Sequence, residues 1–121
     1  MRLPIALLLC AVSLFAAGEL SGRRAPGFAL PDSSLRYHDP QDYRGRILIV
    51  DFMATNCPHC ATLSRILEQV KSHYGGKVAV LSIVNPPADN QNTVSRYAAA
   101  HKVTSPILFD CGQVAASYLR V

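Results

Sequence analysis

The feature that most constrains this 121-residue chain is an apolar run that leads directly into a Cys-x-x-Cys motif. The run Ile47–Val50 predicts a strand, and the helical pattern that follows places Cys57 and Cys60 on the first turn of a helix. In that position the two sulfurs can close a small disulfide ring, and the free amides of the helix start favour a thiolate on the first sulfur. Because a thiolate is the attacking species in disulfide exchange, the motif predicts a redox-active dithiol.

The apolar periodicity predicts alternating strands and helices, with the apolar run as the central strand, over about 46–53. Its uninterrupted apolar character indicates a strand covered on both faces, in a parallel or mixed sheet flanked by helices. The fold class is therefore α/β. The other expected elements are short hairpin arms over 28–30 and 35–37, a helix from Cys57 to Gly75-Gly76, a strand over 78–84, a helix over about 90–101 capped by Asp89 or Asn90, a strand over 107–109 and a last helical turn over 113–118.

The N-terminal residues have the pattern of an export signal. A positive start at Met1-Arg2 precedes an apolar run of about 15 residues that ends in the small residues Ala16-Ala17-Gly18. This run is shorter than the roughly 20 residues that span a bilayer, although an uncleaved N-terminal anchor is an alternative. We predict a signal peptide over 1–18, a linker over 19–27 and one domain over 28–121. Export combined with Cys-x-x-Cys indicates a periplasmic or other extracytoplasmic location.

The distribution of charge and the spacing of possible metal ligands indicate whether the chain binds nucleic acid or a metal ion. The formal charge is +4, but the basic residues are scattered and are not interleaved with aromatic residues, so we predict no nucleic-acid partner. A closed zinc site needs four ligands, and His73, His101 and Cys111 stand singly, so we predict no metal site. Copper(I) accepts two or three soft ligands, which leaves a Cu(I)-binding or delivery module using the two cysteines as an alternative. His38, like His73 and His101, is interpreted as a surface residue.

The motif suggests separate roles for its residues. Cys57 is the candidate nucleophile, and Cys60, one turn further into the helix, is the candidate resolving thiol. Pro58 suits the first helical turn because its missing N–H costs nothing there. His59 is expected to stabilise the Cys57 thiolate, which would make the disulfide a stronger oxidant. For His59, the alternative is an exposed spacer without electronic effect. For Cys57 and Cys60, the alternative is a structural disulfide or half of a metal site.

Asp51 ends the apolar run six residues before Cys57. A carboxylate in such a run is costly unless it has a partner or a function. Burial would raise its pKa and suit it to accept the proton of Cys60 during exchange, although a solvent-facing strand end is the alternative. Cys111 follows the strand expected over 107–109, and a half-buried residue, a third redox thiol and an intermolecular bridge are all compatible with it.

The stretch from Val50 to Cys60 resembles the thioredoxin superfamily. The flanks, with Ala25-Pro26-Gly27-Phe28 near the start and Pro106-Ile107-Leu108-Phe109-Asp110 near the end, are similar to the exported thioredoxin-like group of the TlpA/ResA type. The resemblance covers about residues 25–121. It implies a thioredoxin-like mixed sheet, an attacking Cys57, a resolving Cys60, and an Asp51 that matches the buried acid of thioredoxin.

The sequence departs from the family pattern at three points. Asn56 and Met53 stand where aromatic residues are frequent, and the Cys-Pro-His-Cys motif resembles that of DsbA-type oxidases. The resemblance places a cis-proline loop, a hairpin and a terminal helix beyond Val121, so we expect a C-terminally incomplete domain, with the last hairpin and helix missing and an unprotected sheet edge. The peroxidase branch is disfavoured, because Ala54-Thr55-Asn56 does not match its Pro and Thr spacing.

These observations together predict an extracytoplasmic thiol–disulfide oxidoreductase that works through a redox-active Cys57–Cys60 disulfide. Its partners are protein thiols or disulfides, no dissociable cofactor is needed, and electrons come from a membrane thiol carrier. Reduction of protein disulfides is the leading direction of exchange, and a disulfide-donating oxidase is the alternative.

Overall fold

A computed structural model describes residues 20–121, so the signal peptide predicted over 1–18 lies outside the described residues. Residues 20–29 form neither helix nor strand. The boundary between linker and domain stays a prediction. None of the helices in the described part of the chain has the length and apolar character needed to cross a membrane.

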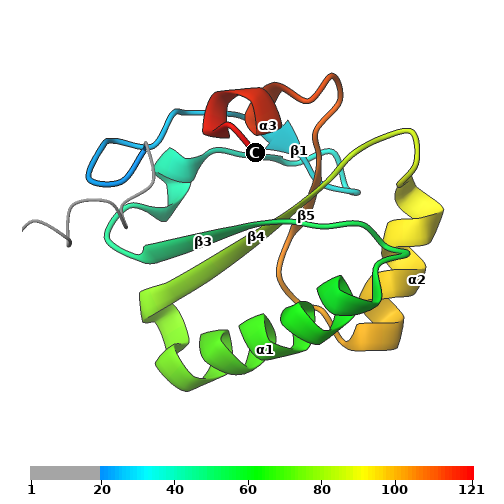
Figure 1. The fold of residues 1–121 in the computed structure, drawn as a ribbon. Helices are drawn as coiled ribbons and strands as arrows, with labels where there is room; N and C mark the ends of the chain where they lie inside the picture. The colour runs from blue at the N-terminus through cyan, green and yellow to red at the C-terminus, as the bar shows by residue number, and fades with distance from the viewer. Residues whose placement is uncertain (1–19) are drawn as a thin grey trace, which may run out of the picture.

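A parallel sheet of three strands, in the order β3-β4-β5, forms the middle layer of the domain. The strands are β3 (Ile47–Phe52), β4 (Val78–Val84) and β5 (Ile107–Phe109). Figure 1 shows α1 (Pro58–Tyr74) below this sheet and α3 (Val114–Leu119) above it. The alternation of strands and helices predicted from the sequence is confirmed.

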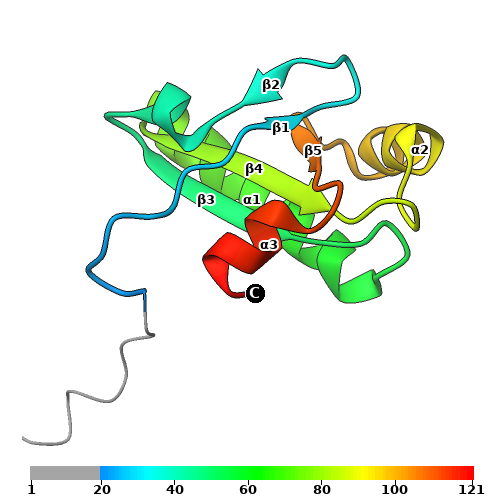
Figure 2. The same cartoon turned by 90° about the horizontal axis from the view of Figure 1, so that it is seen from above.

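Two apolar clusters hold the layers together. On one face of the sheet, Leu81 and Ile83 of β4 pack with Phe28, Leu108 and Ala115, which brings α3 onto the strands (Figure 2). On the other face, Val84 packs with Met53, Ile107 and two residues of α2 (Gln91–His101), Val94 and Tyr97, while Cys60 and Ala61 of α1 contact the same cluster. Alternate residues of β4 thus serve opposite faces, as the two-residue period of a strand requires.

Within residues 20–121, the run over 46–53 is not the central strand, so that prediction is wrong for the described residues. All seven residues of β4 are buried and β4 pairs on both sides, whereas β3 is the outer strand and is mostly half-buried. An apolar run shows that the two faces of a strand are covered, but carries no information about how many neighbours the strand has.

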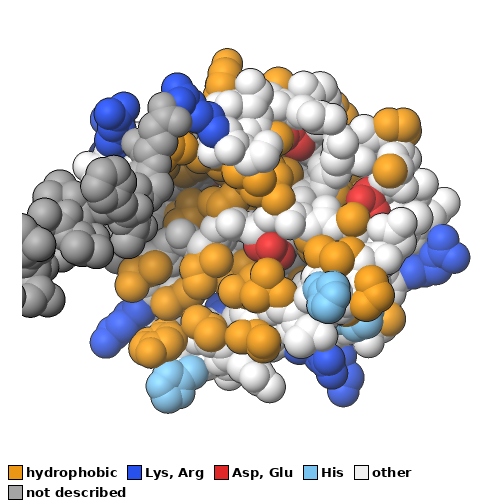
Figure 3. Space-filling model, viewed as in Figure 1, with side chains coloured by type: hydrophobic (Ala, Val, Ile, Leu, Met, Phe, Trp, Pro, Cys, Tyr) orange, Lys and Arg blue, Asp and Glu red, His pale blue; other side chains and the backbone are white. Residues whose placement is uncertain are grey.

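The outer edge of β3 carries no strand partner within residues 20–121. Several large apolar side chains are exposed on the neighbouring elements, among them Ile47 of β3 and Leu63, Ile66 and Tyr74 of α1. The space-filling view from this side shows hydrophobic side chains gathered over α1 (Figure 3). The expected unprotected sheet edge is therefore present in the described residues.

The N-terminal hairpin differs in detail from its prediction. Its strands are β1 (Leu30–Pro31) and β2 (Tyr37–His38), and an antiparallel bridge from Asp32 to Leu108 joins it to β5. His38 is buried, not a surface residue: its Nε2 lies 2.9 Å from Asp32 Oδ2 and its Nδ1 lies 2.8 Å from the Tyr43 hydroxyl. Asp32 and Tyr43 are close to His38 in sequence. Only the folded hairpin and the 3-10 turn η3 (Pro40–Tyr43), however, place them against the two nitrogens of its imidazole ring.

Local sequence explains where the helices begin and end. Asn90 caps α2 by accepting the amides of Asn92 and Thr93, which satisfies two of the free donors at a helix start. At the C-terminal end of α1, Gly75 takes a positive φ of 57°, a conformation that glycine adopts without strain. The 3-10 turn η4 (Gly75–Lys77) then leads into β4.

Candidate active site

The Cys-x-x-Cys pair lies at the start of α1, as the sequence predicts. Pro58 is the first residue of the helix and Cys57 is its N-cap. In place of the usual oxygen, the Cys57 sulfur accepts the Cys60 amide at 3.2 Å. Both side chains are partly exposed, and both are thiols in this structure. The backbone therefore presents a hydrogen-bond donor to one sulfur of the pair.

The two sulfurs differ in acidity. Hydrogen bonds from the Cys60 thiol, the Cys60 amide and the His59 amide hold the pKa of Cys57 below its usual value, because they stabilise its thiolate. Burial, followed by the hydrogen bond to Cys57, raises the pKa of Cys60. At a given pH, Cys57 therefore carries more thiolate than Cys60.

Asp51 is buried on β3, with 9% of its surface exposed. Its side chain has a hydrogen bond with Ser82 of β4, the residue directly beside it in the register, while its Oδ2 has no hydrogen-bond partner. Burial raises the pKa of this carboxyl despite the contact with Ser82. The negative charge of Asp51 acts on both cysteines, and on each of them it favours the protonated thiol.

The other residues singled out from the sequence lie around the pair. Pro58, His59 and Asn56 are exposed. The His59 amide contributes to the stabilisation of the Cys57 thiolate, whereas its imidazole forms no hydrogen bond with the described residues. Cys111 is also exposed and follows β5. An effect of the His59 imidazole and a function for Cys111 stay predictions.

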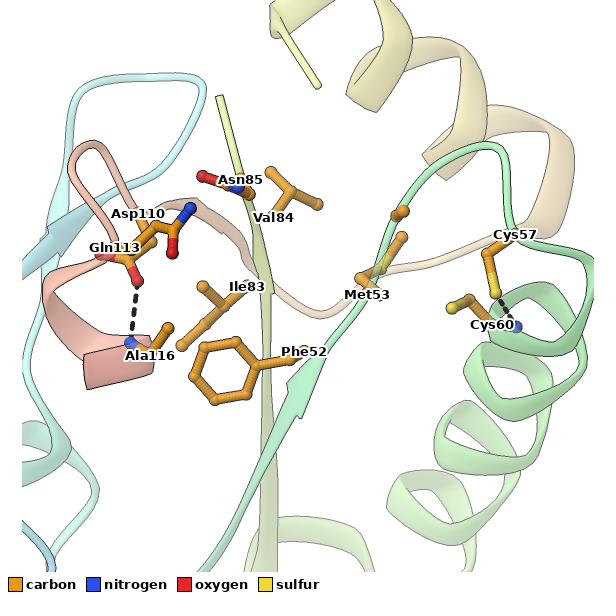
Figure 4. Close-up of a pocket in the computed structure, with 11 residues that line it drawn as sticks. Phe52, Met53, Cys57, Cys60, Ile83, Val84, Asn85, Asp110, Gln113 and Ala116 are labelled. Atoms are coloured by element: carbon orange, nitrogen blue, oxygen red, sulfur yellow. Dashed lines mark hydrogen bonds between the residues drawn. The ribbon is translucent and has the colours of Figure 1, made fainter. Parts of the chain in front are cut away.

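A pocket of about 370 Å³ opens beside the two cysteines. Figure 4 shows Cys57 and Cys60 on one side of it and Asp110, Gln113 and Ala116 on the other. Asp110 is almost fully buried and accepts the amides of Ala115 and Ala116, so its carboxylate is held by the start of α3. Apolar side chains line the space between these two sides: Phe52, Met53, Ile83 and Val84.

Sequence reasoning missed three partners of the site, all brought in by tertiary structure. Ser82 contacts Asp51 from the neighbouring strand. The Tyr97 hydroxyl of α2 lies 2.8 Å from the Ser64 hydroxyl of α1. Asp89 accepts two hydrogen bonds from Thr55, in the turn before Cys57. Nothing local in the sequence marks these residues, since each partner lies about 30 or more positions away.

Metal ligation by a larger cluster finds no support in the described part of the chain. Residues 20–121 contain no group of three or more His, Cys, Asp or Glu side chains placed to hold a metal ion. The two sulfurs of the Cys-x-x-Cys pair are the soft ligands that lie together at the site.

Comparisons with known proteins agree with this geometry. The chain is 29% identical over 102 residues to the thioredoxin-like protein YneN of Bacillus subtilis, covering 84% of this chain and 60% of YneN. Among solved structures, the thioredoxin domain of a thiol-disulfide oxidoreductase from Bacteroides vulgatus matches with a TM-score of 0.72 at 13% identity, over 83% of this chain and 73% of that chain.

A secreted Mycobacterium tuberculosis disulfide oxidoreductase, described as homologous to E. coli DsbE, matches with a TM-score of 0.65 at 18% identity, over 75% of this chain and 66% of that chain. These likenesses confirm a thioredoxin-like fold. Residues 21–121 match the AhpC/TSA family over nearly all of the described chain. The chain therefore belongs to the AhpC/TSA family and has the thioredoxin-like fold that the resemblance of its sequence implies.

Proposed function

We propose that the protein is an extracytoplasmic thiol–disulfide oxidoreductase that reduces disulfides in other proteins. The observation that carries the proposal is the difference between the two sulfurs. The pKa of Cys57 is lowered and its sulfur borders the pocket, whereas the pKa of Cys60 is raised one helical turn away. This arrangement suits an attacking thiolate followed by a resolving thiol.

The exchange proceeds in two steps. The Cys57 thiolate attacks one sulfur of a substrate disulfide, so that a mixed disulfide forms at Cys57 and the other substrate sulfur leaves as a thiolate. Cys60, after losing its proton, attacks the Cys57 sulfur and releases the second substrate thiolate. The products are a reduced substrate dithiol and a Cys57–Cys60 disulfide, so two electrons have passed from the protein to the substrate.

Asp51 is the group we propose to accept the Cys60 proton. It is buried, its Oδ2 has no hydrogen-bond partner, and its charge acts on both thiols. A raised pKa makes this carboxylate a better base than an exposed aspartate. Asp51 would then pass the proton to solvent once the substrate has left.

The direction of electron flow is supported by the surroundings of His59. A cation that stabilised the Cys57 thiolate would stabilise the reduced protein and make its disulfide a strong oxidant. The His59 imidazole is exposed and has no hydrogen bond to either sulfur in the described residues. We propose that the protein acts as a reductant, regenerated by a membrane thiol carrier that donates electrons to the Cys57–Cys60 disulfide.

The extracytoplasmic location is supported by the export-like pattern at the N-terminus and by a similar solved protein that is described as secreted. Fractionation of cells that express the protein tests it directly. Recovery in the cytoplasmic fraction, with the N-terminal segment intact, would contradict the location.

Two assays test the activity and its direction. The wild-type protein should accelerate the reduction of insulin by dithiothreitol, Cys57→Ser should abolish the acceleration, and Cys111→Ser, the matched control, should leave it intact. The reduction potential of the pair should lie near that of thioredoxin, about −270 mV, and a value near that of DsbA, about −120 mV, would reverse the direction. A protein that binds one Cu(I) tightly through both cysteines and shows no exchange would be a copper-binding module instead.

A further inference from the structure

Asp89 is a buried carboxylate that reaches the Cys-x-x-Cys turn from a separate part of the chain. It lies in the loop between β4 and α2, and 4% of its surface is exposed. Its Oδ1 accepts the Thr55 amide at 3.1 Å and the Thr55 hydroxyl at 2.5 Å. Asn90, not Asp89, caps α2. The carboxylate of Asp89 is therefore directed at the turn before Cys57 and not at its own helix.

The peptide group that Asp89 holds is the one that anchors Cys57. The amide of Thr55 and the carbonyl of Ala54 belong to the same planar unit. Its N–H donates to Asp89, while its carbonyl accepts the Cys57 amide at 3.3 Å. A rotation of this unit would break both contacts together, because the two groups point in opposite directions from one rigid plane.

The same turn also contacts the second sulfur. The Ala54 amide forms a hydrogen bond to Cys60 that favours its thiolate. On the other side of Ala54, the Met53 amide donates to the Ile83 carbonyl at 2.9 Å, which ties the start of the turn to β4. Asp89 and β4 thus hold the two ends of the short segment 53–55, and the backbone groups of this segment contact both cysteines.

We propose that Asp89 is a positioning residue for the Cys57–Cys60 pair, which it acts on by fixing the Ala54–Thr55 peptide in the orientation that anchors Cys57. This inference rests on the proposed function of the pair. A carboxylate placed only to stabilise the loop would affect the unfolding free energy. A positioning residue must in addition affect how Cys57 reacts in the folded protein.

The test compares Asp89→Ala, Asp89→Asn and Thr55→Val in the full chain. Asp89→Ala removes the acceptor and leaves the half-buried amide and hydroxyl of Thr55 without it. Asp89→Asn keeps an oxygen that can accept the Thr55 amide, so it should retain most of the wild-type behaviour. Thr55→Val removes the hydroxyl contact but keeps the peptide N–H, so it should have an intermediate effect. Asp42→Ala is the matched control, since Asp42 is an exposed carboxylate that accepts a backbone amide, that of Asp39, far along the chain from Cys57.

Two readouts separate positioning from stability. The rate of Cys57 alkylation by iodoacetamide as a function of pH is measured in a Cys111→Ser background by mass-spectrometric quantification of the adduct on Cys57. It reports the thiolate at Cys57 without requiring exchange activity. The rate of insulin reduction reports the complete reaction. Urea denaturation of each variant gives the folded fraction, to which both rates are corrected.

We expect Asp89→Ala to slow insulin reduction by about 10-fold to 100-fold, the range typical of small displacements of reacting groups, and to move the pH midpoint of alkylation upward. Asp89→Asn should restore the midpoint. If Asp89→Ala does not fold, Thr55→Val provides the test. A smaller upward shift of its alkylation midpoint would support the positioning role, and an unchanged midpoint would contradict it. An unchanged alkylation profile in every folded variant, with only the urea midpoint lowered, would overturn the inference. Absence of insulin reduction by the wild type, with the alkylation profile still dependent on Asp89, would refute the proposed function but not the positioning role.

Discussion

Glu68 of α1 provides the most quantitative test of how this domain is held together. Its carboxylate is 18% exposed and accepts the amide and the hydroxyl of Thr104, at 3.1 and 2.7 Å, and those of Ser105, at 3.0 and 2.7 Å. Lys71 lies one turn away, with its Nζ 3.0 Å from Glu68 Oε2. We call these four residues the Glu68 cluster. It joins α1 to the segment that leads into β5, so it connects two layers of the fold.

The cluster shifts the acidity of Glu68 enough to give a measurable effect. Burial alone would raise its pKa, but the hydrogen bonds from Ser105, Thr104 and Lys71 outweigh burial and lower the pKa from 4.5 to about 2. Since each pKa unit corresponds to about 1.4 kcal/mol, the ionised form is stabilised in the folded state by about 3 kcal/mol. A lowered folded pKa means that this stability is present above pH 4.5 and is lost as the pH falls towards 2.

The perturbation is Glu68→Gln, which keeps the size of the side chain and removes its charge. The free energy of unfolding, measured by urea denaturation, should be lower in the variant at pH 7, and about 2 kcal/mol of the difference from wild type should disappear between pH 7 and pH 3. Asp42→Asn, at an exposed carboxylate, should change the unfolding free energy by less than about 0.5 kcal/mol. If wild type and Glu68→Gln lose stability in parallel as the pH falls, the reasoning about the Glu68 cluster is refuted.

Three further predictions follow from other buried groups. Asp51→Asn should raise the urea midpoint at pH 7, because burial raises the pKa of Asp51 and the ionisation of this carboxyl therefore opposes folding. The same variant should slow insulin reduction, because the proposed acceptor of the Cys60 proton is lost. A variant that is faster and less stable than wild type would contradict both roles. Tyr97→Phe should cost about 1–3 kcal/mol of unfolding free energy, because the buried Ser64 hydroxyl loses its partner, and an unchanged urea midpoint would show that the pair contributes nothing. Leu81→Ala, at a fully buried position of β4, should cost about 3–5 kcal/mol, whereas Leu35→Ala at an exposed position serves as the control and should cost little.

The order of strands and helices was predictable because each element carries its own local signal. The apolar residues of α1 recur at helical spacing up to Gly75-Gly76. β4 is rich in β-branched residues and lies between these two glycines and a loop that contains prolines. Cys57 at the N-cap and Pro58 at the first helical position follow from short-range rules. The position of the dithiol at a strand–helix turn could therefore be predicted from the sequence alone.

The place of a strand in the sheet could not be predicted in this way. β3 and β4 are both apolar runs, and only pairing across the chain makes β4 the middle strand. His38 illustrates the same limit on a smaller scale, since its burial depends on how the hairpin places Asp32 and Tyr43 around its ring. Asp89 was expected as one of two candidate caps, and its contact with Thr55 depends on how the β4–α2 loop folds back onto the turn.

The central claim is that Cys57 attacks and Cys60 resolves, and trapping of the mixed disulfide tests it most directly. A Cys60→Ser, Cys111→Ser variant of the full chain is incubated with oxidised glutathione and then mapped by mass spectrometry. We predict one glutathione on Cys57, and, for the protein with Cys60 restored, conversion of this adduct into the Cys57–Cys60 disulfide. The assignment of the two sulfurs would be contradicted if no adduct formed on Cys57. It would also be contradicted if, in the matched Cys57→Ser, Cys111→Ser variant, an adduct formed on Cys60 as fast as the adduct on Cys57 forms in the first variant.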